Sequence, residues 1–319
     1  MNAADSITVT PLMARDEAAA ERIFRVAFGR WLGAPNPEQF FADRDYVRVR
    51  RAAPHVVALA AHRERELVGS NFITRWGSVG FFGPLTVQPD LQNQGIARAL
   101  LEATVAQLEA WALDCAGLFT FADSPKHLAL YQRYGFLPRF LTTIMARAVP
   151  PGAHTLHSGW WRYTSLTPAL QASLRGALRE LTESVHPGLD LTDEIETLTQ
   201  CGLGEVLVLT ENSRADGVAL CHYGARSEAG AETLLVKFAA VRPDGNANRN
   251  FMGLLDACAA EASACGAATL MAGVNTARRE CHANLLAAGF GGVIHGIAMH
   301  RHDRPGYSRP GVHVIDDWR

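Results

Sequence analysis

The sequence predicts an α/β protein made of two tandem domains packed together, each a mixed sheet with helices on both faces. Three observations predict this fold class. The chain has 319 residues, which is enough for two domains of ordinary size. Its hydrophobic share is 48% and its charged share is 19%, so each half can bury a core. Helix-like and strand-like patterns alternate along the chain, and the order found in the first half returns in the second.

The return of the pattern is an internal repeat with a constant offset. The matching pairs are Val87 and Val241, Pro89 and Pro243, Gly135 and Gly289, Phe136 and Phe290, Met145 and Met299, and Arg147 and Arg301, each 154 residues apart. A unit of this length is a whole domain and not a solenoid module. We therefore predict two domains, residues 1–150 (the first copy) and residues 151–319 (the second copy).

In the first copy, apolar spacing predicts helices at 16–32, 38–51, 95–112 and 125–133, and strands at 55–62, 67–76, 79–87, 118–122 and 137–148. The third helix is the clearest, because Leu101, Val105 and Leu108 recur at helical spacing. The charged turn at 63–66 joins the first two strands. The last strand is expected to close the sheet.

In the second copy, the same reasoning predicts helices at 169–184, 251–265 and 278–288, and strands at 205–209, 217–223, 232–241 and 268–274. The segment 150–161 begins Pro150-Pro151-Gly152 and is the expected linker. Residues 160–165 either complete the first sheet or begin the second.

Charge and composition exclude several classes of protein. The formal net charge is −2, from 30 basic and 32 acidic residues, which argues against a nucleic-acid binder. The densest basic stretch, Arg48, Arg50 and Arg51, is expected to form a solvated helix face. No apolar run reaches about 18 residues, so no membrane span is expected.

The six cysteines contain no C-x-x-C pair and lie mostly in apolar runs, which is typical of reduced, buried thiols. The first ten residues have neither a basic flank nor an apolar core, so no signal peptide is expected. Together these features predict a cytoplasmic protein without a metal site.

The stretch 85–101 is the most informative for function. It runs from a strand through a polar turn into a helix, and the turn ends at Gly95. The first N–H groups of a helix have no internal partner and carry a partial positive charge, so such a tip binds phosphate. Gly95 allows close approach of the backbone and Ala97 keeps the next turn small. Gln92 and Gln94 have amides that either bridge phosphate oxygens or brace the loop. A glycine at a strand–helix turn is also common as a purely structural feature.

Gln92, Gly95 and Ala97 occupy the defining positions of a motif similar to Q/R-x-x-G-x-G/A, the acetyl-CoA motif of the GNAT superfamily of acyl-CoA N-acyltransferases. A second stretch, Leu130-Tyr131-Gln-Arg-Tyr-Gly135-Phe136, resembles the L-Y-x-x-x-G-F signature of the same family. The resemblance covers strand order, both motifs and their spacing over residues 55–148. The tandem arrangement is similar to that of the mycothiol synthases.

The resemblance implies an N-acetyltransferase that passes the acetyl group of acetyl-CoA to a primary amine of a small molecule, by direct attack in a ternary complex. It implies a cofactor site made of Leu85, Thr86, Val87, Gln92, Asn93, Gln94, Gly95, Ile96, Ala97, Arg98, Ser124 and Tyr131. A main-chain N–H of Val87 or its neighbour should polarise the thioester carbonyl, and residues 31–40 should wall the acceptor site. Ser124 stands where many relatives carry asparagine, and its hydroxyl can replace one contact of the amide but not two.

Tyr131 is, by the same resemblance, the general acid that protonates the departing CoA thiolate. A phenol donor is chemically suited to this role, although Tyr131 could instead be a core aromatic. The attacking amine must lose a proton, and residues 78–87 contain no acid to accept it. Asp123 is the first candidate base and His127 the second, but Asp123 could cap a helix, His127 could be solvated, and a water relay would serve as well.

The second copy is expected to have lost acetyl-CoA binding. At the offset of 154, the positions of Gln92, Gly95, Ala97 and Tyr131 are held by Asn246, Arg249, Phe251 and Leu285. Arg249 and Phe251 should obstruct a pyrophosphate, and leucine cannot donate a proton; the alternative is that Arg249 makes a new anion contact. Two other functions stay open: a non-catalytic acyl-CoA-binding regulatory protein, and acyl-CoA hydrolysis or decarboxylation. The acceptor and the oligomeric state are not specified by the sequence.

Overall fold

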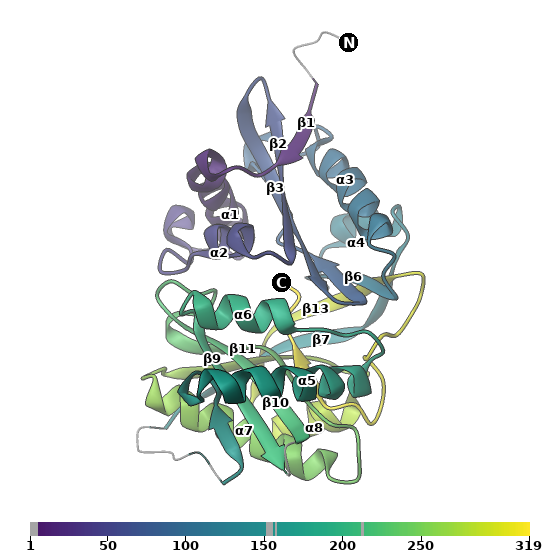
Figure 1. Ribbon diagram of the computed structural model, residues 1–319. Helices are drawn as coiled ribbons and strands as arrows, with labels where there is room; N and C mark the ends of the chain where they lie inside the picture. The colour runs from purple at the N-terminus through teal and green to yellow at the C-terminus, as the bar shows by residue number, and fades with distance from the viewer. Residues whose placement is uncertain (1–5, 151–155, 157, 212–213) are drawn as a thin grey trace.

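The computed structural model describes residues 6–150, 156, 158–211 and 214–319. Two α/β halves are stacked one above the other, and Arg319 lies at the boundary between them (Figure 1). In the described part of the chain a 14-stranded sheet runs through both halves. Its strand order is β1-β2-β3-β4-β6-β13-β7-β12-β11-β10-β9-β8, with β5 added to β3 and β14 to β11. The predicted fold class, two mixed-sheet α/β copies packed together, is confirmed.

The first copy contributes the elements β1 (Thr8–Pro11), α1 (Glu17–Trp31), α2 (Tyr46–Ala52), β2 (Val56–Arg63), β3 (Glu66–Trp76), β4 (Val79–Phe82), β5 (Thr86–Val87), α3 (Ile96–Ala110), β6 (Cys115–Phe121), α4 (Pro125–Gln132) and β7 (Phe136–Ala148). Helices α1 and α2 pack on one face of the sheet through Ala20 and Val47, and α3 and α4 cover the other through Leu101 and Tyr131. The strand predicted at 79–87 is two strands, because the chain leaves the ladder after Phe82.

The second copy contributes β8 (Trp160–Arg162), α5 (Pro168–Val185), α6 (Thr192–Gln200), β9 (Gly204–Glu211), β10 (Arg214–Gly224), β11 (Gly230–Val241), α7 (Ala247–Ala264), β12 (Thr269–Asn275), α8 (Arg279–Ala287), β13 (Gly291–Arg301) and β14 (Val314–Asp316). Helix α5 begins where the Thr167 hydroxyl accepts from the Leu170 N–H and Pro168 takes the first turn. Strand β8 pairs with β9, so residues 160–162 belong to the second sheet. The linker positions 151–155 and 157 lie outside the described residues.

The closing strands of the two copies are exchanged. Strand β7 does not pair with β6 of its own copy; it pairs with β12, where Met145 faces Ala272. Strand β13 pairs with β6 of the first copy, where Met299 faces Leu118. Each copy therefore completes the sheet of the other, and the expectation that 137–148 closes the first sheet is corrected. The boundary near residue 150 remains a prediction about the sequence, since the sheet crosses it.

The segment between α1 and α2 differs from the sequence prediction. A helix was expected over 38–51, but only a short 3-10 turn at Pro37–Gln39 and α2 from Tyr46 are helical. Phe41, with φ at 53°, turns the chain between them. The expected solvated basic face is also wrong in part: Arg48 is exposed, whereas Arg50 is only 3% exposed. Arg50 forms buried contacts that link the copies and are described below.

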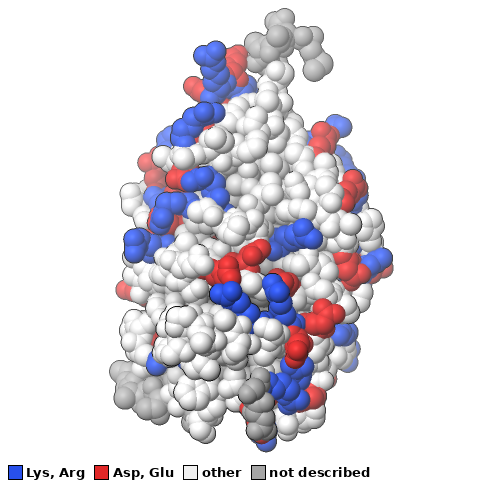
Figure 2. All heavy atoms as spheres, in the orientation of Figure 1, with Lys and Arg blue, Asp and Glu red and all other residues white. Residues whose placement is uncertain are grey.

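The charged surface is mixed in sign, and four of the six thiols are buried. Positive and negative side chains are interspersed on the face shown in Figure 2, with no field of one sign. All six cysteines are free, and Cys115, Cys221, Cys258 and Cys281 are buried. Within the described residues, no helix has the length and apolar character needed to cross a membrane.

The strand exchange makes a testable prediction at Gly296. A Cβ at Gly296 would lie 2.3 Å from Cζ of Phe119 and 2.5 Å from the carbonyl oxygen of Thr120, both on β6. Overpacking of this kind costs about 1–3 kcal/mol, so Gly296→Ala should lower the free energy of unfolding by that amount in urea titrations. Gly291→Ala on the same strand is the control, because nothing lies within 4 Å of its Cβ. Equal stabilities for the two variants would contradict the position of β13 beside β6.

Candidate active site

Two parallel strands of the first copy diverge at their carboxyl ends. Strand β4 pairs with β6 from Val79 opposite Cys115 to Phe82 opposite Leu118, and the ladder then stops. The chain turns at Gly83, whose φ of 143° favours glycine, and at Pro84, which has no N–H to donate. Strand β5 then pairs with β3 alone, while β6 continues to Phe121. The carboxyl ends of such strands are where open α/β sheets bind ligands.

The loop after β5 leads directly into the open tip of α3. Gly95 is the N-cap of this helix, with φ at 85°, and a Cβ there would meet nothing closer than Ile7 at 3.9 Å. The first intrahelical bond runs from the N–H of Ala99 to the carbonyl oxygen of Gly95. In the described part of the chain, the N–H groups of Ile96, Ala97 and Arg98 have no acceptor. These donors form a site for an anion at the edge of the divergence.

The other predicted cofactor residues lie around this tip. Ile96 is buried with Leu100 beneath the loop, and Leu85 and Val87 pack on the same side of the sheet. The Thr86 hydroxyl is buried against that of Ser70 at 3.0 Å. Asn93 adopts a left-handed conformation, with φ at 65°.

Polar side chains brace the loop from both sides. Arg63 donates to Oε1 of Gln94 at 2.7 Å, and Arg98 donates to Glu102 at 2.9 Å. The ammonium group of Lys126, at the start of α4, lies 3.5 Å from Oε1 of Gln92. Sequence reasoning missed Lys126, although it is one of only two lysines in the chain. Its charge faces the same loop and adds to the attraction for an anion.

Tyr131 projects from α4 into the apolar layer beneath the divergence. It is 9% exposed and packs against Phe82, with ring centroids 5.8 Å apart. Burial raises the pKa of its phenol to about 12, so the phenol keeps its proton at neutral pH. None of the described residues hydrogen-bonds its hydroxyl, which leaves the O–H available to a ligand. Tyr134 is partly buried against the same core.

His127 contacts the residues around Tyr131. The buried Ser124 hydroxyl is 2.9 Å from Nδ1 of His127, whose ring stands 6.5 Å from that of Tyr131. Burial, and then the neighbouring Lys126 ammonium, lower the pKa of His127, so its ring is neutral at pH 7. Asp123 is exposed and makes no hydrogen bond or ion pair with any described residue. It does not cap α4, whose N-cap position is Ser124.

Aromatic side chains from the predicted acceptor wall meet the end of β6. Trp31 stands 5.9 Å from Phe121 and 5.4 Å from His127, measured between ring centroids. It remains 45% exposed, so its ring can still contact a ligand. Of the segment 31–40, Trp31 is the residue that the structure brings to the candidate site.

The second copy does not form the corresponding loop. Strand β12 and helix α8 begin 154 residues after β6 and α4, and α7 ends 154 residues after α3. Helix α7 nevertheless begins at Ala247, three residues earlier than this offset gives for α3, so Arg249 is helical where Gly95 forms the open tip. Phe251 and Leu285 are fully buried in the core. No left-handed residue opens the start of this helix, since Asn246 has φ at −98°.

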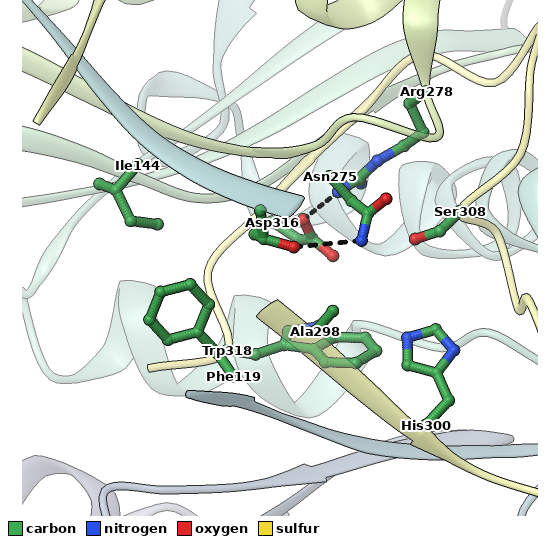
Figure 3. A pocket seen from close by; sticks show the side chains of 10 residues that line it. Phe119, Ile144, Asn275, Arg278, Ala298, His300, Ser308, Asp316 and Trp318 are labelled. Atoms are coloured by element: carbon green, nitrogen blue, oxygen red, sulfur yellow. Dashed lines mark hydrogen bonds and ion pairs between the residues drawn. The ribbon is translucent and has the colours of Figure 1, made fainter. Parts of the chain in front are cut away.

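The divergence of strands in the second copy is filled by β14. Strands β11 and β12 pair as far as Val236 opposite Ala272, and β14 then pairs with β11, with Asp316 opposite Phe238. A Cβ at Gly273 on β12 would lie 2.1 Å from the carbonyl oxygen of Asp316, so the backbones are in contact. A small cavity remains beside Asp316, lined by Asn275, Arg278 and His300 (Figure 3). The guanidinium of Arg278 is paired with Asp316 at 2.5 Å.

Comparisons with known proteins agree with this geometry. The model of the acetyltransferase (GNAT) family matches residues 19–136. The chain is similar to a mycothiol acetyltransferase of Streptomyces griseus subsp. griseus, with 32% identity over 130 residues, which is 38% of this chain and 40% of the relative. The chain thus spans about two fifths of the length of the curated relatives it matches.

Solved structures match over nearly the whole chain. One is a putative acetyltransferase from Pyrococcus horikoshii, with a TM-score of 0.67, 14% identity and coverage of 98% of this chain and 95% of that one. Another is a tandem GNAT protein from the clavulanic acid biosynthesis pathway, with a TM-score of 0.58, 15% identity and coverage of 92% and 98%. The fold of the whole chain is thus similar to that of tandem GNAT proteins, and the sequence match to the acetyltransferase (GNAT) family is confined to residues 19–136.

Proposed function

We propose that the chain is an acetyl-CoA-dependent N-acetyltransferase whose working site lies in the first copy. The observation that carries the proposal is the open tip of α3. Its unpaired N–H groups at Ile96, Ala97 and Arg98 lie beside diverging strands, next to a left-handed glycine. A diphosphate placed there would accept these N–H groups, and the rest of the cofactor would extend between β5 and β6. The GNAT match over residues 19–136 supports the same cofactor.

In the proposed reaction, a primary amine of a small molecule attacks the thioester carbonyl directly. A main-chain N–H near Val87 would stabilise the developing oxyanion. Tyr131 would donate its proton to the CoA thiolate as the C–S bond breaks. The support is chemical: the phenol is buried, protonated at neutral pH and without a partner among the described residues.

For the proton of the amine, we favour His127 over Asp123. His127 is neutral, contacts Ser124 and lies beside the ring of Trp31, whereas Asp123 has no hydrogen bond or ion pair with a described residue that would orient it. A neutral imidazole near a substrate can accept a proton directly or through one water molecule. A mostly protonated amine of pKa about 10 needs such help at pH 7.

We infer that the second copy does not bind the cofactor. Its helix α7 winds through the residues that would form the loop, and β14 occupies the space between β11 and β12. The competing function, an acyl-CoA-binding regulatory protein, would show binding without turnover. An acyl-CoA hydrolase would instead release thiol without any amine.

The direct test mixes the protein with acetyl-CoA and a panel of small primary amines, and follows free thiol. Amine-dependent release is the expected result. Tyr131→Phe should lower kcat at least about 100-fold, the usual scale for a lost general acid, with little change in the Kd of acetyl-CoA from calorimetry. Because the pKa of Tyr131 is raised to about 12, thiol release should show no falling limb below about pH 11. A wild-type rate in Tyr131→Phe would contradict the acid role.

The base assignment is tested by His127→Gln against Asp123→Asn. His127→Gln should lower kcat/KM for the amine about 10-fold or more at pH 7, and less at higher pH, where the free amine is abundant. Asp123→Asn should stay within about twofold, since this carboxylate has no oriented contact. The reverse order of effects, measured as kcat/KM across pH 6–9, would restore Asp123 as the base.

Gly95→Glu tests the cofactor site itself. A carboxylate at the open tip would repel the diphosphate, and a side chain would strain a residue with φ at 85°. The Kd of acetyl-CoA should rise at least about 10-fold, which corresponds to about 1.4 kcal/mol. Gly245→Glu, in the turn before α7, makes the same charge change in open space and should leave the Kd unchanged. Full affinity in Gly95→Glu would remove the first copy as the binding half.

A further inference from the structure

Arg50 joins the strand break of the first copy to the second copy. It lies in α2 and is 3% exposed. Its Nη1 donates to the carbonyl oxygen of Gly83, at the point where β4 leaves β6. Its Nε and Nη2 donate to the two carboxylate oxygens of Glu228, at 2.7 and 3.0 Å. Glu228 belongs to the turn between β10 and β11, so one guanidinium holds both copies.

Lys237 completes this buried group from the equivalent position of the second copy. It stands 154 residues after Gly83, and its ammonium donates to Oε2 of Glu228 at 2.7 Å. Gly83 and Lys237 therefore hold equivalent positions in the two copies. Lys237 bonds Glu228 directly, and Gly83 is linked to Glu228 by Arg50. Arg50 also donates to the carbonyl oxygen of Arg319, beside the same break.

The pair is ionised despite its burial. Burial alone would lower the pKa of Arg50, but the Glu228 carboxylate outweighs it and the pKa is raised. Burial alone would raise the pKa of Glu228, but Arg50 first and Lys237 second hold it well below its usual range. A buried ion pair of this kind seldom adds more stability than apolar residues of similar volume, but it fixes geometry through directed bonds.

The geometry fixed here is that of the main chain at the divergence. The Gly83 carbonyl has left the β4–β6 ladder, and a buried carbonyl without a donor is unfavourable. The guanidinium of Arg50 supplies the donor and fixes the direction of the carbonyl in the peptide group that joins Gly83 to Pro84. That peptide leads into β5, where the oxyanion N–H of the proposed reaction lies.

We propose that Arg50 and Glu228 are positioning residues: through them the second copy holds the break at Gly83 in the shape that acetyl transfer by the first copy requires. The proposal rests on the proposed function for its catalytic consequence. It assigns a role to the second copy, because Glu228, in its turn between β10 and β11, holds the arginine that bonds the Gly83 carbonyl.

The test compares Arg50→Lys and Glu228→Gln with Glu194→Gln. Lysine keeps the charge of Arg50 but lacks the planar fork whose three nitrogens bond Gly83, Glu228 and Arg319. Glu194 is the control: it is buried in the second copy and bonds His55 and Trp76 of the first, each at 2.9 Å, and it has no hydrogen bond to Gly83 or Arg50 among the described residues. Arg50→Lys should lower kcat at least about 10-fold with KM for acetyl-CoA within about twofold, Glu228→Gln should lower it less, and Glu194→Gln should lower only Tm.

Hydrogen exchange followed by mass spectrometry supplies a readout that needs no acceptor. Amides at 83–88 should exchange faster in Arg50→Lys than in wild type, and at the wild-type rate in Glu194→Gln. Should Arg50→Lys not fold, Glu228→Gln decides by the same measurement. Wild-type exchange at 83–88, or a loss of kcat no larger than in Glu194→Gln, overturns the proposal. Absence of turnover on every amine in the wild type would instead reject the proposed function, while the exchange result still decides the positioning role.

Discussion

The candidate site depends on one constraint, the end of the parallel ladder between β4 and β6 at Phe82 and Leu118. Beyond it, Gly83 and Pro84 carry the chain away from β6, and the backbone N–H and C=O groups of the two strands no longer pair with each other. The same turn brings the start of α3 to the carboxyl end of the sheet, where the N–H groups of Ile96, Ala97 and Arg98 have no acceptor among the described residues. Both the anion site and the space beside Tyr131 follow from this divergence, since a continued ladder would close them with main-chain hydrogen bonds.

In the second copy the corresponding divergence is closed by the protein itself. There β14 enters the gap and pairs with β11, and α7 extends by three residues over the former loop. Both changes give hydrogen-bond partners to backbone N–H and C=O groups whose equivalents in the first copy have none. The two copies therefore differ in how the backbone at the divergence is paired. The exchange of β7 and β13 joins the second copy to the first, because each sheet is completed by a strand of the other copy.

Much of this could be predicted from the sequence, and each failure has its own physical cause. The repeat and the helix after Gly95 follow from local spacing, and the structure agrees with them. The strand exchange could not be found in this way: β7 and β13 occupy equivalent positions of the repeat, so each carries the apolar pattern that either sheet requires. The burial of Arg50 was missed because its partner Glu228 is 178 residues away. The false helix over 38–51 arose because apolar spacing continued across a turn that Phe41 forms.

The placement of the two lysines supports a division of labour between the copies. Every other basic side chain, histidine aside, is arginine, yet Lys126 faces the loop at Gln92 and Lys237 is buried on Glu228. An ammonium is a compact charge and lacks the planar set of directed donors that a guanidinium has. At Gln92 it adds positive potential where N–H groups already supply direction. At Glu228 it neutralises charge while Arg50 alone supplies the directed bonds to Gly83. Each lysine thus contributes positive charge. Directed hydrogen bonds come from the backbone N–H groups at the start of α3 in the first copy, and from Arg50 at Glu228.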